Sequence, residues 1–293
     1  MAESKSKTFR QLLERSGILL RPCGYDALSA LLIERAGFRL MGTSGYAISA
    51  SAIGQPDLGL ISFGELLERA RNICNCVSIP VDIDADTGYG NALNAYWTAK
   101  NYIWIGAAGI RVEDQTWPKR CGHMSGKSII SREEMVWKIK AMIRAREEEG
   151  SDLVIGARTD ARSIEGFEST IERAVAYADA GADYIYVECP QSLKEVEHLV
   201  KGIQIPLAFN LIPGGKTPPF SISDLEAIGV KYLSIPMVCL YPAVRAMSSA
   251  LEALKSFDLQ KVGELGINWS EFNDLIGARL WREREREFGG EKK

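Results

Sequence analysis

The sequence of 293 residues has only two histidines, no HExxH motif and no long apolar run, and each absence excludes a class of protein. The few histidines and the lack of paired thiols argue against a zinc enzyme. The six cysteines are scattered, which favours reduced thiols. No stretch approaches the roughly 18 consecutive apolar residues of a membrane span, and no signal-type segment follows the polar first residues. We therefore expect a cytoplasmic protein with no membrane partner.

Charge narrows the choice of partners further. The 35 basic and 38 acidic side chains give a formal net charge of −3, and the basic residues are interleaved with acids. This distribution predicts no nucleic-acid partner. Apolar residues make up 46% of the chain, which is enough for a large core.

Short apolar, β-branched runs alternate with helical patterns along the chain. We predict strands over 18–21, 38–42, 79–84, 109–113, 153–158, 184–188, 205–210 and 232–236. Three helices begin with a capping-box signature, at Ser62…Glu65, Ser131…Glu134 and Ser223…Glu226. Eight such units predict an α/β fold of the (β/α)8 TIM-barrel type. The alternative, a doubly wound open sheet, lacks its usual Gly-x-Gly-x-x-Gly turn after the first strand.

Two further helical stretches follow the eighth strand, over 241–257 and 268–288. A barrel of eight strand–helix units does not require these additional helices. We expect one barrel domain over 1–293, with 241–293 as a C-terminal helical extension that packs outside the barrel, against a neighbouring subunit.

Polar residues gather where the predicted strands end, and a barrel places its active site at these ends. The residues are Ser44, Gly45, Tyr46, Asp84, Asp86, Glu113, Arg158, Glu188 and Asn210. Converging carboxylates would repel one another without a cation, and oxygen ligands favour a hard ion such as Mg²⁺. We expect Asp84 to bind the metal directly, and Asp57, Asp86 and Glu113 to reach it through water. Arg158 is placed to clamp a substrate carboxylate; the alternative is a salt bridge to Asp160 or Glu188.

The segment Lys119-Arg120-Cys121-Gly122-His123 puts a thiol and an imidazole two residues apart, between cationic side chains. Such a thiol can exchange a proton with a reacting carbon. The alternative is a polar surface loop.

Together these motifs resemble the isocitrate lyase/phosphoenolpyruvate mutase superfamily, over essentially the whole chain. The resemblance rests on the residues already named and on 24–29, 55–59, 82–90, 112–115 and 157–160. It implies a (β/α)8 barrel, a homotetramer that exchanges its last helical segment between subunits, and Mg²⁺, which Mn²⁺ can replace.

The Cys121 loop is typical of superfamily members that break a carbon–carbon bond in a 2-hydroxy dicarboxylate. The resemblance implies that Cys121 protonates the resulting carbanion. It further implies that Ser44, Gly45, Gly122, His123, Arg158, Glu188 and Asn210 contact substrate or metal. Lys119 and His123 would tune the thiol and hold the loop closed, and Tyr46 is a candidate base by position.

Two departures from the tricarboxylate-cleaving pattern and one from the oxaloacetate-hydrolysing pattern bear on the substrate. Met124-Ser125-Gly126 follows His123, Leu211-Ile212-Pro213 follows Asn210, and Pro242 stands where oxaloacetate-hydrolysing members tend to carry serine. An apolar wall would disfavour a third carboxylate. We therefore expect cleavage of 2,3-dimethylmalate to pyruvate and propionate. The alternatives are 2-methylisocitrate lyase, giving pyruvate and succinate, oxaloacetate hydrolase and, more remotely, a phosphonate mutase or hydrolase.

Overall fold

The computed structural model describes residues 4–289 and divides into two compact units. The first unit ends at Cys239, and the second begins at Leu240.

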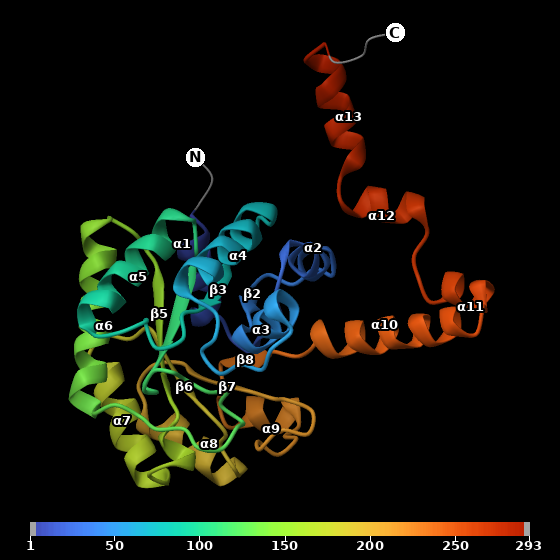
Figure 1. Cartoon of the computed structure of the whole chain (residues 1–293). Coiled ribbons are helices and arrows are strands. Elements are labelled where there is room, and N and C mark those ends of the chain that lie inside the picture. Colours follow the sequence, from blue (N-terminus) through green and yellow to red (C-terminus); the bar gives the residue numbers. More distant parts are fainter. Residues whose placement is uncertain (1–3, 290–293) are drawn as a thin grey trace. The chain divides into compact units, whose positions relative to one another are not determined.

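Eight parallel strands close into a barrel in the first unit, and β1 pairs with both β2 and β8 (Figure 1). The strands are β1 (Leu19–Gly24), β2 (Met41–Thr43), β3 (Val81–Asp84), β4 (Gly109–Glu113), β5 (Val154–Thr159), β6 (Tyr184–Val187), β7 (Leu207–Asn210) and β8 (Tyr232–Ile235). The predicted (β/α)8 barrel is confirmed, and each predicted strand range overlaps one observed strand.

Helices connect the strands around the outside of this barrel, and one further helix, α1, precedes the first strand (Figure 1). They are α1 (Lys5–Glu14), α2 (Ala27–Arg35), α3 (Gly45–Ile53), α4 (Phe63–Cys76), α5 (Ala92–Trp104), α6 (Arg132–Glu148), α7 (Phe167–Asp179), α8 (Leu193–Gly202) and α9 (Ile222–Ala227), with a 3₁₀ turn over Ala161–Ser163. Ser62 forms the predicted capping box, and Ser131 accepts from the N–H of Glu134. The cap predicted at Ser223 is wrong, because Ser221 accepts from the N–H of Asp224 and starts α9 earlier.

A buried polar layer fills the barrel beneath the site. Asp82 accepts hydrogen bonds from the hydroxyls of Tyr184 and Tyr232, both at 2.8 Å, and pairs with Nε of Arg21 at 2.9 Å. The ring of Phe9 from α1 packs against both tyrosines. Buried polar groups that have hydrogen-bond partners resist rearrangement. This layer therefore makes the base of the pocket rigid.

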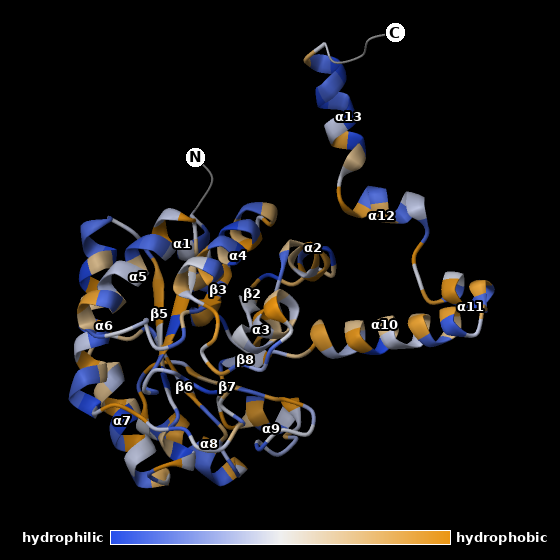
Figure 2. Cartoon of the chain, viewed as in Figure 1, coloured by the Kyte–Doolittle hydropathy of each residue, from blue (hydrophilic) through white to orange (hydrophobic). Residues whose placement is uncertain are grey.

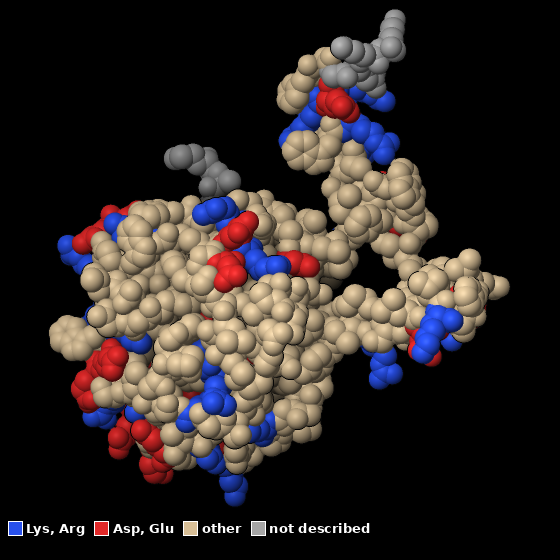
Figure 3. Space-filling view, viewed as in Figure 1, with Lys and Arg blue, Asp and Glu red and all other residues tan. Residues whose placement is uncertain are grey.

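The second unit consists of α10 (Leu240–Lys255), α11 (Leu259–Glu264), α12 (Trp269–Leu275) and α13 (Ala278–Glu287). Apolar residues recur along α10 in Figure 2, and Val244, Met247, Leu251 and Leu254 form an exposed stripe at helical spacing. On the face that Figure 3 shows, most of the visible surface of α10 to α12 belongs to uncharged residues. Among residues 4–289, no helix is long and apolar enough to span a bilayer.

Candidate active site

A pocket opens at the carboxyl ends of the strands, and the loop over 119–123 forms part of its wall. Most of the predicted site residues line it: Ser44, Gly45, Tyr46, Asp57, Asp84, Lys119, Cys121, Gly122, His123, Arg158, Glu188 and Asn210. Two predicted metal ligands do not. Asp86 lines an adjoining cavity together with Asp57 and Gly45, and Glu113 is buried next to Arg158.

The four predicted metal ligands each lie beside a cation from the chain. Oδ2 of Asp84 is 3.2 Å from Nη2 of Arg111. Nζ of Lys119 bridges Oδ2 of Asp57 at 2.8 Å and Oδ1 of Asp86 at 2.7 Å. Oε2 of Glu113 is 3.4 Å from Nε of Arg158. The sequence did not predict these pairs, which join β3 to β4, join β4 to β5, and link three loops through Lys119.

The titration of these carboxyls differs according to their neighbours. Burial opposes ionisation of Asp84, but the Arg111 guanidinium holds the pKa of that carboxyl at about 2. Burial raises the pKa of Asp86 to about 6 in spite of Lys119. Burial likewise raises the pKa of Glu113 well above its usual range. Its Oε1 has no hydrogen-bond partner among the described residues. A hard cation with water ligands fits this set, because the chain's own cations do not offset the burial of Asp86 and Glu113, whose pKa values remain raised.

Arg158 is held by acids of the chain. Its Nε and Nη2 donate to the carboxylate of Asp160 at 2.8 and 3.0 Å, and its Nη1 lies 3.2 Å from Oε2 of Glu188. The salt bridges weighed as the alternative for Arg158 are therefore present. Arg158 still lines the pocket, with its bidentate edge turned to Asp160.

Arg111, on β4, is a pocket residue that the sequence reasoning missed. Its side chain is only 5% exposed, and its guanidinium lies 4.4 Å from the centre of the Tyr186 ring. Among the described residues, Nε and Nη1 have no hydrogen-bond partner. The residue lies two positions before Glu113, so both side chains point into the barrel. The alternation of side chains along a strand could have placed Arg111 on the same side as Glu113. Arg111 was overlooked because it stands inside an otherwise apolar run, where it resembles an ordinary strand residue.

The loop over 119–127 is tied down across the pocket by contacts at both ends. The N–H of Cys121 donates to the carbonyl of Asp57 at 3.1 Å. Nε2 of His123 lies 3.0 Å from both Oδ1 of Asn210 and Oε1 of Glu188. Nζ of Lys127 donates to Oδ1 of Asp160, just after β5, at 2.5 Å. The loop is therefore closed in this structure.

Gly122 is the residue that permits this closure. A Cβ at this position would lie 2.3 Å from Cδ of Glu188 and 2.4 Å from Nη2 of Arg158. Contacts this short are essentially absent from real structures, so with any other residue here the Glu188 and Arg158 side chains or the loop itself would have to move.

The Cys121 thiol faces this enclosed pocket. Burial raises the pKa of Cys121 to about 11, although a hydrogen bond from the His123 backbone opposes the shift. The sulfur therefore keeps its proton at neutral pH. A protonated thiol can act as a general acid but is a poor nucleophile.

Comparison with known proteins gives consistent matches along the chain. The family described as phosphoenolpyruvate phosphomutase matches residues 9–255. The chain is 41% identical to 2,3-dimethylmalate lyase of Eubacterium barkeri, over 95% of this chain and 96% of the relative. It is 41% identical to a chloroplastic carboxyvinyl-carboxyphosphonate phosphorylmutase of Arabidopsis thaliana, over 94% and 83%. It is 39% identical to 2-methylisocitrate lyase of Aeropyrum pernix, over 97% and 91%.

Solved structures agree with these matches. Oxaloacetate acetylhydrolase in complex with 3,3-difluorooxalacetate superposes with a TM-score of 0.93 at 33% identity, over 99% of both chains. Phosphonopyruvate hydrolase in complex with oxalate and Mg²⁺ superposes with a TM-score of 0.86 at 28% identity, over 97% of this chain and 99% of the other.

Proposed function

The chain belongs to the phosphoenolpyruvate phosphomutase family and is a carbon–carbon lyase, and we propose that its substrate is 2,3-dimethylmalate, which it cleaves to pyruvate and propionate. The observation that carries the proposal is the position of Cys121, a protonated thiol held by a closed loop over buried carboxylates. A general acid at this position could protonate the carbanion that forms when a carbon–carbon bond breaks.

We propose that Mg²⁺ binds at the carboxylate cluster and that Mn²⁺ can replace it. Asp84 would be the direct ligand, with Asp57, Asp86 and Glu113 acting through water. When bound, the ion stabilises negative charge on the oxygens of the 2-oxo acid half. The unpartnered Oε1 of Glu113 and the Mg²⁺ in the related phosphonopyruvate hydrolase structure support this assignment.

The chain's own residues then carry the proton transfers. Tyr46 takes the proton of the 2-hydroxyl, and the C2–C3 bond breaks as the hydroxyl carbon becomes the carbonyl of pyruvate. The electron pair of that bond remains on C3, next to the second carboxylate. Cys121 gives its proton to C3 and forms propionate. Ser44, Gly45 and Asn210 contact the substrate.

We propose that Arg111 binds a substrate carboxylate. Its Nε and Nη1 have no hydrogen-bond partner within residues 4–289, while the paired edge of Arg158 faces Asp160. A buried guanidinium with free N–H groups gains most from a charged acceptor. Arg158 would add its positive charge to the binding of this carboxylate, and its Nη1, which lies beside Glu188, could also donate to the substrate.

The apolar part of the pocket favours a small, methylated substrate. Ile212, Pro236 and Met237 line it on the side of β7 and β8. Methyl groups can pack there, whereas a third carboxylate would lose its hydration without gaining a partner. 2-Methylisocitrate, which would give pyruvate and succinate, is the second candidate, because the relative from Aeropyrum pernix is named for it.

A panel of substrates tests the proposed reaction. The full chain with Mg²⁺ is given 2,3-dimethylmalate, 2-methylisocitrate, oxaloacetate or phosphoenolpyruvate, and pyruvate, oxalate and phosphonopyruvate are measured. We expect the highest kcat/KM with 2,3-dimethylmalate, and no activity after chelation until Mg²⁺ or Mn²⁺ is restored. A higher value for 2-methylisocitrate, or conversion of phosphoenolpyruvate to a phosphonate, would contradict the assignment.

We also propose a homotetramer in which the second unit is covered by neighbouring subunits. Its exposed stripe on α10, together with the exposed Trp269 and Trp281, is more apolar surface than a stable soluble helix needs to show. Light scattering on the purified chain tests this: four copies are expected, and a monomer would refute it.

A further inference from the structure

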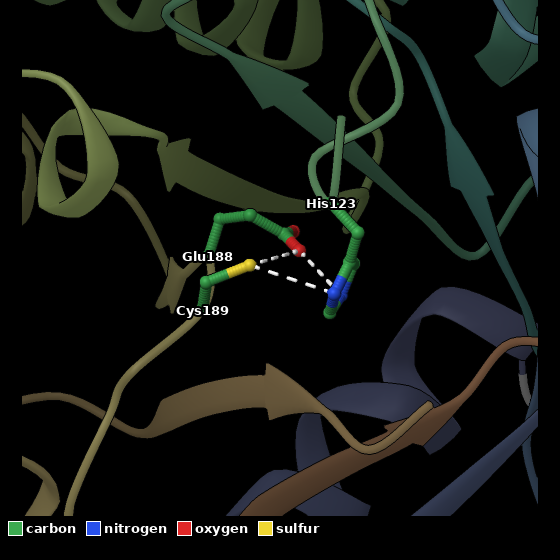
Figure 4. Close-up of side chains that lie close together, drawn as sticks. All are labelled: His123, Glu188 and Cys189. Atoms are coloured by element: carbon green, nitrogen blue, oxygen red, sulfur yellow. Dashed lines mark hydrogen bonds and ion pairs between the residues drawn. The ribbon is translucent and has the colours of Figure 1, made fainter. Parts of the chain in front are cut away.

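A second group of ligand-type side chains lies beside the pocket, apart from the carboxylate cluster. It consists of His123 from the loop, Glu188 at the end of β6 and Cys189, the next residue (Figure 4). Sγ of Cys189 is 3.7 Å from Nδ1 of His123 and 3.5 Å from Oε1 of Glu188. Oε1 of Glu188 is 3.0 Å from Nε2 of His123. One ligand atom from each residue lies within 4.8 Å of the others.

We propose that these three side chains form a binding site for a thiophilic divalent ion such as Zn²⁺, and that occupation of this site inhibits the enzyme. Separations of 3.5 and 3.7 Å between ligand atoms suit an ion at about 2.0–2.3 Å from each. Nitrogen, oxygen and sulfur ligands together select a borderline or soft ion over Mg²⁺. The site is therefore chemically distinct from the all-oxygen cluster around Asp84.

The backbone turns the thiol toward the imidazole. Cys189 has a φ of 56°, an uncommon left-handed conformation for a residue with a side chain. This turn lets two consecutive residues, Glu188 and Cys189, both reach His123, which is distant in sequence. Cys189 is fully buried, whereas His123 and Glu188 line the pocket. An ion would therefore enter through the pocket, and its fourth position would face the substrate.

Binding changes a small set of bonds. The Cys189 thiol loses one proton to solvent, and the thiolate adds a negative charge beside the Glu188 carboxylate, whose Oε2 stays next to Arg158. Coordination by Nδ1 of His123 would displace the N–H of Lys216, which now donates to it at 2.9 Å. The ion would fix His123 and the loop to β6. Substrate entry and product release both need that loop to open, so turnover should stop.

Co²⁺ titration of the full chain, with Mg²⁺ in excess, tests the site without relying on activity. We expect about one Co²⁺ per chain with a near-ultraviolet thiolate-to-Co²⁺ band, displaced by Zn²⁺. Cys189→Ser should abolish the band and weaken Zn²⁺ binding about tenfold or more, in the range that loss of a supporting contact already produces. Its activity without Zn²⁺ should stay near that of the unaltered chain, and Zn²⁺ should inhibit it correspondingly less.

Two further cysteines give matched controls. Cys121→Ser removes a thiol that lines the pocket, and Cys239→Ser removes a partly exposed thiol that lies outside the pocket lining. Both should keep the Co²⁺ band. Absence of the band in the unaltered chain, its persistence in Cys189→Ser, or its loss in Cys121→Ser would overturn the proposal. If Cys189→Ser does not fold, X-ray absorption at the zinc edge of the unaltered chain decides: one sulfur neighbour supports the site, and nitrogen or oxygen neighbours alone refute it.

Discussion

Replacement of Arg111 by glutamine separates substrate binding from metal binding. The change removes two donors that have no partner in the part of the chain that the structure describes, and one cation 3.2 Å from Asp84. Removing one partner of a buried, hydrogen-bonded charge pair costs about 2–5 kcal/mol. This corresponds to a fall in kcat/KM of about 30-fold to a few thousandfold. Arg111→Lys keeps the charge but loses the planar fork, so it should recover only part of the activity.

The same substitution should act on Mg²⁺ in the opposite direction. Arg111 neutralises Asp84, so its removal leaves that carboxylate more available to a divalent ion. Steady-state kinetics at varied substrate and varied Mg²⁺ should therefore show a higher KM for substrate and an equal or lower Mg²⁺ concentration for half activation. Arg162→Gln is the matched control, because Arg162 pairs with Glu195 and does not line the pocket. A kcat/KM for Arg111→Gln within a few fold of the unaltered chain would refute the reasoning, and so would a parallel loss of substrate and Mg²⁺ affinity.

Three further predictions concern the loop. Cys121→Ser should lower kcat by about 10²–10⁴ with little effect on Mg²⁺ and oxalate binding; near-normal kcat would remove Cys121 from the mechanism. Gly122→Ala should impair kcat and KM together but barely change the free energy of unfolding, since its Cβ would meet Glu188 and Arg158 and hold the loop open; unchanged kinetics would contradict the closed loop. Because burial raises the pKa of Cys121 to about 11, the thiolate fraction grows with pH, and alkylation by iodoacetamide should accelerate about tenfold per pH unit up to about pH 10. A plateau at about pH 9 would contradict that shift.

The fold followed from the sequence because its signals are local. Strand–helix alternation and serine caps depend on neighbouring residues, and eight repeats leave few alternatives. Strand ends were less accurate. The first predicted strand stops before Pro22, which lacks the N–H that a sheet uses. The observed strand continues to Gly24, because β2 pairs with Cys23 and Gly24.

Site residues could be predicted where their position at a strand end is enough to place them in the pocket. They could not be predicted where contacts between distant parts of the chain place them there. Strand-end residues such as Asp84 and Glu188 come to the pocket in any such barrel. The bridge from Lys119 to Asp57 spans 62 positions and depends on how two loops fold. Arg111 was concealed inside an apolar strand. Cys189 gave no signal either, because scattered cysteines predict no metal site until a backbone turn brings the thiol to His123.

The most direct test of the proposed lyase mechanism is to follow the proton that Cys121 is proposed to deliver. 2,3-Dimethylmalate is cleaved by the full chain with Mg²⁺ in D₂O, and the propionate is analysed for deuterium at C2. We expect equimolar pyruvate and propionate, and the propionate should carry one deuterium at C2 in a single configuration, because a positioned thiol protonates only one face of the carbanion. Propionate labelled equally in both configurations, or no pyruvate at all, would contradict it.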